Sequence, residues 1–457
     1  MQLPSQQVII LNSARVVEDL LNNRSSIYGD KCRGVMDEIL GWDWGISTMP
    51  YGRRWTYARK YIHQCLNNNA VQQYRDVQQQ RVRQFLQRTL EEQDGSASIK
   101  SVNYLFASII IEVAYGIRIQ GLDDPLVINI MEALETFNAI KVPGAFWVDI
   151  FPLLRYLPKW TPGVTFHQYG DLNKPKVAAA RERPFKRTVQ DIDNGVAPPS
   201  MVHDLLHVIR EEYTDTHEYS EQEGYLKDAA GTVYGAGVET THSTVCWFIL
   251  AMAMHPHIQE KAQRELERAV GGDRLPTHED YDSLPYVQAI IRETLRWAPA
   301  VPMGIPHRVM IDDEYEGYHI PKGCMLVPNI WDVAMCHDPE DYPNPDTFDP
   351  ERHLDEEGCI DPEVRDPHTI VFGYGRRICA GRYLAKEAIF LTIASILYVF
   401  NIRPALDEDG KPMELSISTA APRSGLFLHP ERLDCTLTPR SDIAVKLVTE
   451  VYEHDTA

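Results

Sequence analysis

The chain has 457 residues, of which 44% are hydrophobic and 24% charged, and its formal net charge is −20 at pH 7. This composition is ordinary for a globular protein, and the acidic balance argues against nucleic-acid binding, which needs a basic face. No linker, repeat or low-complexity tract divides the sequence, so we expect a single domain over residues 1–457. The eight cysteines include no Cys-x-x-Cys pair, which favours a reducing compartment.

The predicted secondary structure is mostly helical. The apolar run 8–11 predicts a strand, and apolar spacing with stop signals predicts helices over 13–22, 55–92, 101–117, 200–212, 221–254, 256–270 and 285–297. Residues 145–166 are apolar and aromatic, but three prolines prevent one continuous helix. A hairpin is expected around Gly317 and Gly323, and 338–354 should be loop. The uncharged stretch 388–402 is short for a membrane span and predicts a buried helix. The fold class is therefore mainly α with small β-sheets.

The most informative segment is the glycine-rich loop Phe-Gly-Tyr-Gly-Arg-Arg-Ile-Cys-Ala-Gly at 372–381. It places Cys379 two residues after Arg377 and just before a helix. Backbone N–H groups at a helix start and a nearby guanidinium stabilise a thiolate, while Gly375 and Gly381 let a flat macrocycle approach the backbone. A haem iron held by a cysteine thiolate needs each of these parts. The alternative is a buried structural cysteine in a turn.

A second motif interrupts the long apolar helix predicted over 221–254. The run Ala-Gly-Val-Glu-Thr-Thr at 236–241 puts a glycine and an acid–alcohol pair where they are locally unfavourable. One hypothesis is a groove at Gly237 in which O2 can sit, with Glu239 and Thr240 relaying protons. The other is a helix kink with the threonine bonded back to the chain.

Two further pairs have helical spacing. Glu293 and Arg296 lie three residues apart on one face, as on many surface helices. Trp55 and Arg59 lie four apart, and both are donors suited to a carboxylate. Each pair, taken alone, is equally compatible with a solvated surface.

Together these motifs resemble the cytochrome P450 family. The loop is similar to that family's haem-binding loop at Phe372, Gly375, Arg377, Cys379 and Gly381, and the motifs keep the family order from about residue 8 to about residue 440. The resemblance implies the P450 fold, with haem b (iron protoporphyrin IX) between the long central helix and the cysteine loop. It makes Cys379 the axial ligand of the iron. It also implies an oxygen-activation motif formed by Ala236, Gly237, Glu239 and Thr240.

The resemblance assigns roles to further residues. It implies that Trp55, Arg59, His307 and Arg377 bind haem propionates. Glu293 and Arg296 should lock onto Arg352, next to which His353 departs from the phenylalanine frequent in the family. The distal pocket should present apolar side chains, for which core packing is the alternative: Trp42, Ile46, Val233, Val301, Met303 and Leu426.

The implied function is a monooxygenase that inserts one oxygen atom from O2 into a hydrophobic substrate of secondary-metabolite, terpenoid or xenobiotic type. Electrons would come from NADPH through NADPH–cytochrome P450 reductase, with cytochrome b5 as a further candidate partner. The alternatives are a haem-thiolate isomerase, dehydratase or reductase, and a truncated haem-binding protein without activity. Basic residues beside Trp55 and the cysteine loop predict a docking face for an acidic reductase: Arg53, Arg54, Lys60, Arg376, Arg382 and Lys386.

The expected location also follows from the resemblance. Residues 151–163 look like fungal microsomal members, which implies the cytoplasmic face of the endoplasmic reticulum membrane. The sequence shows no visible membrane anchor and begins near the family's second strand, so we expect a truncated chain or an incomplete gene model. Residues 145–166 are the candidate for peripheral membrane contact.

Overall fold

The computed structural model describes residues 6–455 except 93–94, 96–97, 122, 143, 215, 332–335 and 416–424. Its longer helices are α4 (Arg53–Leu66), α5 (Arg75–Glu91), α6 (Ile99–Tyr115), α7 (Pro125–Ile140), α9 (Phe166–Asp193), α10 (Met201–Tyr213), α11 (Tyr219–Met254), α12 (Pro256–Val270), α13 (Pro285–Trp297), α15 (Arg382–Val399) and α17 (Asp442–Asp455). Its short helices are α1 (Ala14–Val17), η1 (Glu18–Asn23), α2 (Ser25–Tyr28), α3 (Val35–Leu40), η2 (Ala70–Tyr74), α8 (Trp147–Ile150), η3 (Pro152–Tyr156), η4 (His278–Ser283), η5 (Pro350–His353), α14 (His368–Val371) and η6 (Gly375–Arg377).

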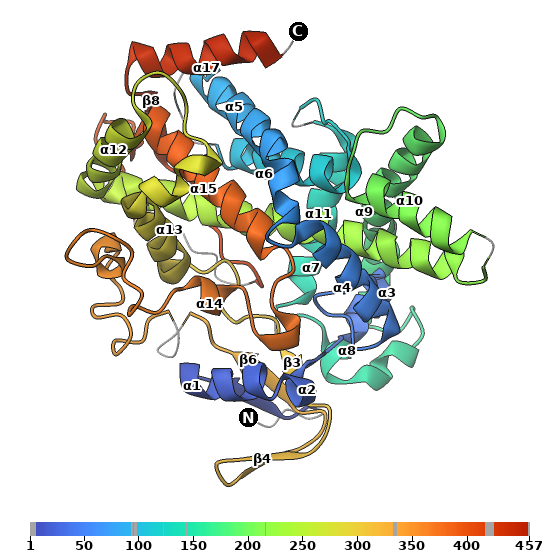
Figure 1. Ribbon diagram of the computed structural model, residues 1–457. Helices are drawn as coiled ribbons and strands as arrows, with labels where there is room; N and C mark the ends of the chain where they lie inside the picture. The colour runs from blue at the N-terminus through green and yellow to red at the C-terminus, as the bar shows by residue number, and fades with distance from the viewer. Residues whose placement is uncertain are drawn as a thin grey trace.

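Helix α11 is the central element of the molecule. It runs across the middle of the ribbon, where α15 crosses it and α6 packs along it (Figure 1). Its last part, residues 245–254, is apolar and almost wholly buried, and Trp247 is fully enclosed there. Burial of each such large side chain stabilises the fold by about 1.5–3 kcal/mol. The helix ends at Met254 because Pro256 lacks the N–H that a continuing helix needs; Pro256 instead opens α12.

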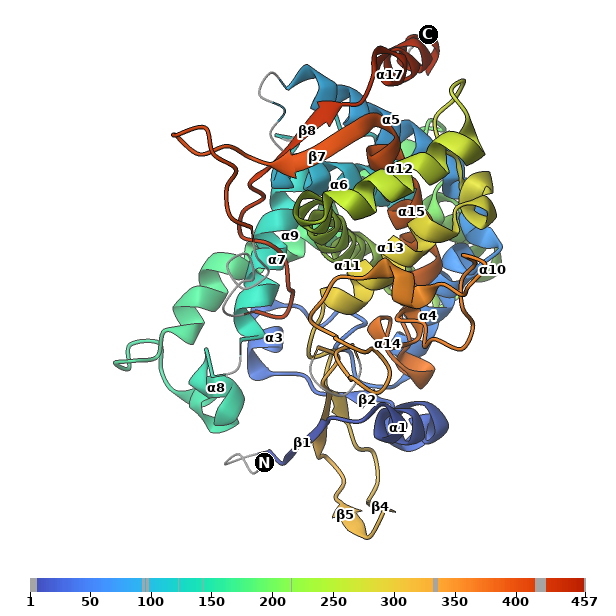
Figure 2. The ribbon, with the colours of Figure 1, turned by 90° about the vertical axis from the view of Figure 1, so that its left-hand side faces the viewer.

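The strands form three small sheets. The first has the order β1 (Val8–Leu11), β6 (Met325–Pro328), β3 (His307–Arg308), β2 (Asp30–Lys31), with β1 parallel to β6 and the other pairs antiparallel. The second is the hairpin β4 (Asp313–Tyr315) and β5 (Tyr318–Ile320), and the third pairs β7 (Phe400–Pro404) with β8 (Cys435–Pro439). In Figure 2 the first two sheets lie at the end of the molecule opposite α17. The register pairs Lys31 with His307 and so brings two basic residues together.

Most predicted elements are confirmed. The strand at 8–11 and the helices at 256–270 and 285–297 have the predicted bounds. The predicted helix 55–92 was wrong as one element, since η2 separates α4 from α5. The predicted hairpin holds only around Gly317, because β6, which begins at Met325, joins a different sheet. As expected, residues 145–166 do not form one helix.

The sequence analysis missed helix α9, which contains Pro175 and Pro184. Proline normally ends a helix because it lacks a donor and clashes with the preceding turn. Here tertiary contacts override that preference: α9 packs on α7, α3 and α11, and buries Val177 and Phe185. Residue preferences along the chain therefore failed to predict α9, because its stability comes from packing against other helices.

Candidate functional site

In the cysteine loop 372–381, Cys379 lies between η6 and the first turn of α15. The backbone N–H of Cys379 donates to the Phe372 carbonyl at 2.7 Å, which closes the loop. Burial raises the pKa of the Cys379 thiol, while the N–H of Gly381, the N–H of Arg382 and the guanidinium of Arg59 all act to lower it. The helix start thus supplies the donors that a thiolate needs, as predicted from the sequence.

The two glycines of this loop differ in what surrounds them. Gly375 has φ +51, and a Cβ there would overlap the Leu21 carbonyl oxygen and the Ser25 side chain. Gly375 is therefore required by packing of the loop on η1 and α2, whereas the sequence analysis assigned it to the approach of a macrocycle. A Cβ on Gly381 would meet nothing within 4 Å, so that position leaves open space beside Cys379.

Arg377 is the best-defined cation near the loop. Its guanidinium carbon lies 4.1 Å from the centroid of the Trp55 ring, and its Nε donates to the Gly29 carbonyl at 2.6 Å. Its Nη2 is buried, has no hydrogen-bond partner in the part of the chain that the structure describes, and lies 3.9 Å from an oxygen of Asp30. Burial lowers the pKa of Arg377 to about 10, with Asp30 acting in the opposite direction. The structure thus brings Arg377 and Trp55, two of the residues predicted to bind propionates, into contact.

Burial also disfavours the charged forms of Lys31, His307 and Arg59. Lys31 donates to the Ile305 carbonyl at 2.6 Å, and burial followed by the charge of Arg377 holds its pKa well below 10.5. His307 shares a 2.8 Å hydrogen bond with the Tyr28 carbonyl, and burial and Lys31 hold its pKa well below 6.5. Burial also lowers the pKa of Arg59, which the charge of Cys379 partly offsets. Among the residues that the structure describes, none of these three forms an ion pair with a carboxylate.

We name this set the basic cradle: Trp55, Arg59, Arg377, His307 and Lys31. Buried basic groups with few anionic partners are unfavourable in their charged forms unless a ligand supplies the anion, so the cradle suits a ligand with carboxylate groups beside Cys379. The sequence analysis found four of these residues and missed Lys31. Only strand pairing with His307 reveals Lys31, because no motif marks it.

The acid–alcohol motif lies in the middle of α11. The Thr240 hydroxyl donates to the Ala236 carbonyl at 2.9 Å, and both residues lie on an open face of the helix. A Cβ on Gly237 would come within 2.9 Å of Ile110 on α6. Gly237 therefore faces α6 and permits close packing of the two helices, so it does not lie on the open face as expected. The small residue on the open face beside Thr240 is Ala236. The alternative, a threonine hydroxyl bonded to the helix backbone, is also present. It is compatible with a proton relay through Glu239 and Thr240.

Glu239 is buried next to Thr240. Burial raises its pKa to about 7, and the carboxylate of Glu135 on α7 adds to this effect. A carboxyl group with this pKa exchanges protons readily at neutral pH, which is the property that general acid–base catalysis requires.

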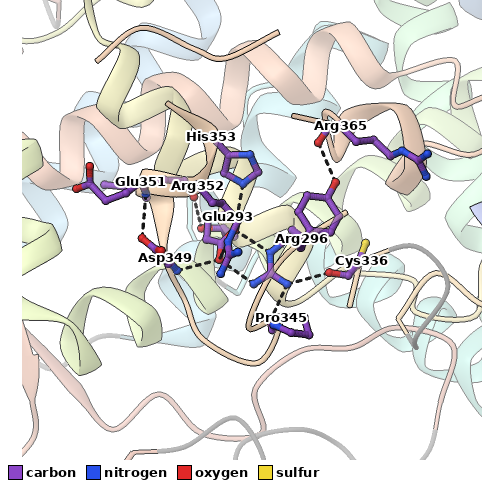
Figure 3. Close-up of polar contacts among 12 residues, drawn as sticks. Glu293, Arg296, Cys336, Pro345, Asp349, Glu351, Arg352, His353 and Arg365 are labelled. Atoms are coloured by element: carbon purple, nitrogen blue, oxygen red, sulfur yellow. Dashed lines mark hydrogen bonds and ion pairs between the residues drawn. The ribbon is translucent and has the colours of Figure 1, made fainter. Parts of the chain in front are cut away.

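Glu293 is the centre of a buried charge network (Figure 3). Its carboxylate accepts from Arg296 at 2.7 and 2.8 Å, from Arg352 at 3.2 Å and from the Asp349 N–H at 2.9 Å. His353 contacts the second carboxylate oxygen at 3.0 Å. Burial alone would raise the pKa of Glu293, but Arg296 and His353 lower it to about 2. The sequence predicted that Glu293, Arg296 and Arg352 form a network, and it marked His353 only as a departure from the family.

Comparison with known proteins agrees with this arrangement. The family model of cytochrome P450 matches residues 1–429. The chain belongs to the cytochrome P450 family. It is 37% identical over 99% of its length to cytochrome P450 monooxygenase COX2 of Coprinopsis cinerea, of which it covers 83%. It is 39% identical to cytochrome P450 monooxygenase ple1 of Rhodocybe pseudopiperita, with 96% and 82% of the two chains covered. It is 35% identical to tryptamine 4-monooxygenase of Psilocybe cyanescens, with 97% and 85% covered.

Membership of the P450 family implies haem with a cysteine thiolate ligand, and the residues of this chain fit that group. Cys379 provides the thiol, two backbone N–H groups stabilise its anion, and open space lies beside Gly381. Nη2 of Arg377, which lacks a hydrogen-bond partner among the described residues, and the buried Lys31 would supply donors for the propionates. In the part of the P450 chain that the structure describes, no helix is both long and apolar enough to cross a membrane.

The six residues predicted to line the P450 substrate pocket fall into two groups. Trp42 is a core residue: its ring packs on Trp44 and Phe137, and its indole N–H donates to the Thr136 hydroxyl at 3.2 Å. For it, the packing alternative describes the contacts better. The other five remain predictions: Ile46, Val233, Val301, Met303 and Leu426. The distal pocket was also predicted to include the segment 419–426, of which residues 419–424 lie outside the described ranges.

Proposed function

We propose that this P450 inserts one oxygen atom from O2 into a hydrophobic small molecule, with electrons from NADPH delivered by a reductase. The observation that carries the proposal is the pairing of a stabilised Cys379 thiol and its basic cradle with an acid–alcohol pair on α11. Both halves are needed for this reaction, and a haem-binding protein without activity needs only the first.

Haem, when bound, supplies the oxygen-activating chemistry. The chain's own residues do the rest. Cys379 holds the iron, and Arg59, Arg377, His307, Lys31 and Trp55 hold and orient the propionates. Glu239 stores a proton at neutral pH, and the Thr240 hydroxyl, whose own proton is donated to the Ala236 carbonyl, offers its oxygen as a hydrogen-bond acceptor on the open face of α11.

The proposed substrates are secondary metabolites, including terpenoids and aromatic amines, or xenobiotics. Apolar positions predicted around the distal side favour a hydrophobic molecule. The 35% identical relative is named as a tryptamine 4-monooxygenase, so tryptamine belongs in a screening panel beside terpenoid and polycyclic compounds.

The test is turnover of this panel by the reconstituted holoenzyme with NADPH, O2 and a P450 reductase. We expect a product that contains one oxygen atom from labelled O2, formed only when NADPH is present. Thr240→Ala should raise hydrogen peroxide formed per NADPH severalfold while haem binding is kept, because proton delivery fails. A product formed without NADPH and O2 would contradict the proposal and favour a haem-thiolate isomerase or dehydratase.

For reductase docking we propose a narrower basic surface than the sequence suggested. Arg54 is held by Asp228 and Asp43 at 2.6 and 2.8 Å, and Arg53 pairs with Glu218 at 2.9 Å. Arg376 and Lys386 form no ion pair within the described ranges, and their charged groups lie against the rings of Tyr51 and Tyr281. Arg376→Glu with Lys386→Glu should slow the first electron transfer in a salt-dependent way. Unchanged reduction kinetics would refute this docking surface.

We also propose that the α8–η3 region contacts the endoplasmic reticulum membrane from the cytoplasmic side. Its exposed apolar side chains form a patch rich in aromatic residues, the kind enriched at membrane interfaces: Trp147, Phe151, Leu153, Tyr156 and Trp160. Vesicle flotation should retain the wild-type chain and lose a Leu153→Asp, Trp160→Asp variant. Equal flotation of the two proteins would exclude this patch as the contact.

A further inference from the structure

A segment near the C-terminal end of the chain is fixed against α11 beside the acid–alcohol motif. The Leu428 carbonyl accepts from the Ser243 hydroxyl and from the Trp247 indole N–H, the latter at 3.0 Å. The Leu428 N–H donates to the Ala300 carbonyl at 2.9 Å. These three bonds hold the next residue, His429, over the helix turn that carries Glu239 and His242.

His429 lies between Glu239 and more open surroundings. Its Nδ1 is 3.9 Å from Oε1 of Glu239, and its side chain is 28% exposed against 11% for Glu239. Its ring centroid is 6.2 Å from that of His242, which is buried. A separation of 3.9 Å is longer than a direct hydrogen bond but can be bridged by one water molecule.

Among the described residues, Glu239, His242 and His429 make no direct hydrogen bond to one another. Both ring nitrogens of His242 and Nδ1 of His429 are buried without a hydrogen-bond partner among the described residues. Such groups cost free energy unless water or a ligand satisfies them. Their position beside the motif that handles protons suggests a reason for retaining them.

The charges around the pair allow proton exchange near neutral pH. Burial raises the pKa of Glu239 to about 7, with Glu135 on α7 adding to it. Burial lowers the pKa of His429, and the Glu431 carboxylate opposes this change. Burial and His429 lower the pKa of His242 to about 3, so His242 stays neutral. A proton on His429 is then favoured to move to Glu239, because burial lowers the pKa of the histidine and raises that of the carboxyl group.

We propose that His429 carries protons from solvent to Glu239. It therefore supports the acid–alcohol pair indirectly, by renewing the proton on Glu239 beside Thr240. Nε2 of His429 takes up a proton from solvent. Nδ1, which faces Glu239, then releases its proton through a bridging water to the Glu239 carboxylate. His429 returns to its neutral form, and Glu239 becomes the carboxylic acid. His242 stabilises the bridging water as a neutral hydrogen-bond partner. This inference rests on the proposed role of Glu239.

The test follows the proton directly and does not require turnover. The carboxyl stretch of protonated Glu239 in the holoenzyme is assigned by its loss in Glu239→Gln. Rapid mixing into D2O then measures exchange of that proton by the shift of the band. We expect exchange in His429→Gln to be about tenfold slower or more, because glutamine cannot relay a proton. His203→Gln is the matched control, since it removes a histidine 2.8 Å from Asp204 on α10 and should leave the rate unchanged.

A functional measurement accompanies the exchange experiment. His429→Gln should form more peroxide per NADPH, and the pH dependence of this ratio near pH 7 should flatten. If His429→Gln does not incorporate haem, His429→Asn replaces it. An unchanged exchange rate in a folded variant overturns the proposal. If the wild type shows no NADPH-dependent turnover, the proposed monooxygenase function fails, whereas the exchange result still decides the role of His429.

Discussion

Two clusters of buried charge in this P450 use the same kinds of side chain but are completed differently. Around Glu293 the protein supplies both signs, and the carboxylate is met by two guanidiniums, a histidine and a backbone N–H. Around Arg377 it supplies almost only cations, with Asp30 at 3.9 Å as the one ion-pair partner of that residue in the described chain. The first cluster is complete without a ligand and is structural. The second would be completed by an anionic ligand, which we propose to be the haem that the family implies.

The largest expected effect is the loss of charge at the centre of the complete cluster. Glu293→Gln leaves the fully buried Arg296 without its counter-ion, and we expect a loss of about 3–5 kcal/mol in stability. Unfolding of the holoenzyme by urea would measure it. Glu351→Gln removes an exposed pair with Lys261 and should cost under about 1 kcal/mol. Equal losses in both variants would contradict the structural role of the Glu293 network.

The pH dependence of the same cluster gives the second prediction. The pKa of Glu293 is about 2 in the folded protein against 4.5 for an ordinary glutamate. Because the folded-state pKa is lower, the stabilisation is fully present above about pH 4.5 and is lost as the pH falls toward about 2. The stability gap between wild type and Glu293→Gln should therefore shrink by about 3 kcal/mol over that window. A constant gap in urea unfolding at several pH values would refute the assignment.

The third prediction concerns the cluster that needs a ligand. Lys31→Met removes one buried cation from the cradle, and we expect haem to dissociate about tenfold faster, which corresponds to about 1.4 kcal/mol. Haem transfer to an excess of apomyoglobin would measure the rate. The exposed Lys322→Met is the control. If Lys31→Met retained haem as the wild type does, Lys31 would not belong to the cradle.

The smallest expected effect is at His353. His353→Phe introduces the residue frequent in the family and removes one of several contacts to Glu293. Arg296, Arg352 and the Asp349 N–H remain, and the apolar ring avoids the desolvation that lowers the pKa of His353. We expect a loss of about 1 kcal/mol in urea unfolding. A loss as large as that of Glu293→Gln would mean that His353 is an essential member of the network.

The sequence predicted the parts of this site that are local in the chain. The Cys379 loop, the 236–241 motif and the Glu293–Arg296 pair each lie within one segment, so their spacing was sufficient. Contacts between distant segments were harder to predict. Lys31 meets His307 only through strand pairing, and His429 reaches Glu239 only because Leu428 is bonded to α11. The misplaced groove at Gly237 has the same origin, since its neighbour Ile110 belongs to another helix.

The most direct test of the account is the carbon monoxide difference spectrum of the reduced, purified protein, recorded for the wild type and for Cys379→Ala. If Cys379 ligates the haem iron, the wild type will show the strongly red-shifted Soret band of thiolate-ligated haem, and the variant will lack it. A wild-type protein that binds haem without this shift, or a Cys379→Ala variant that keeps it, would contradict the assignment of Cys379.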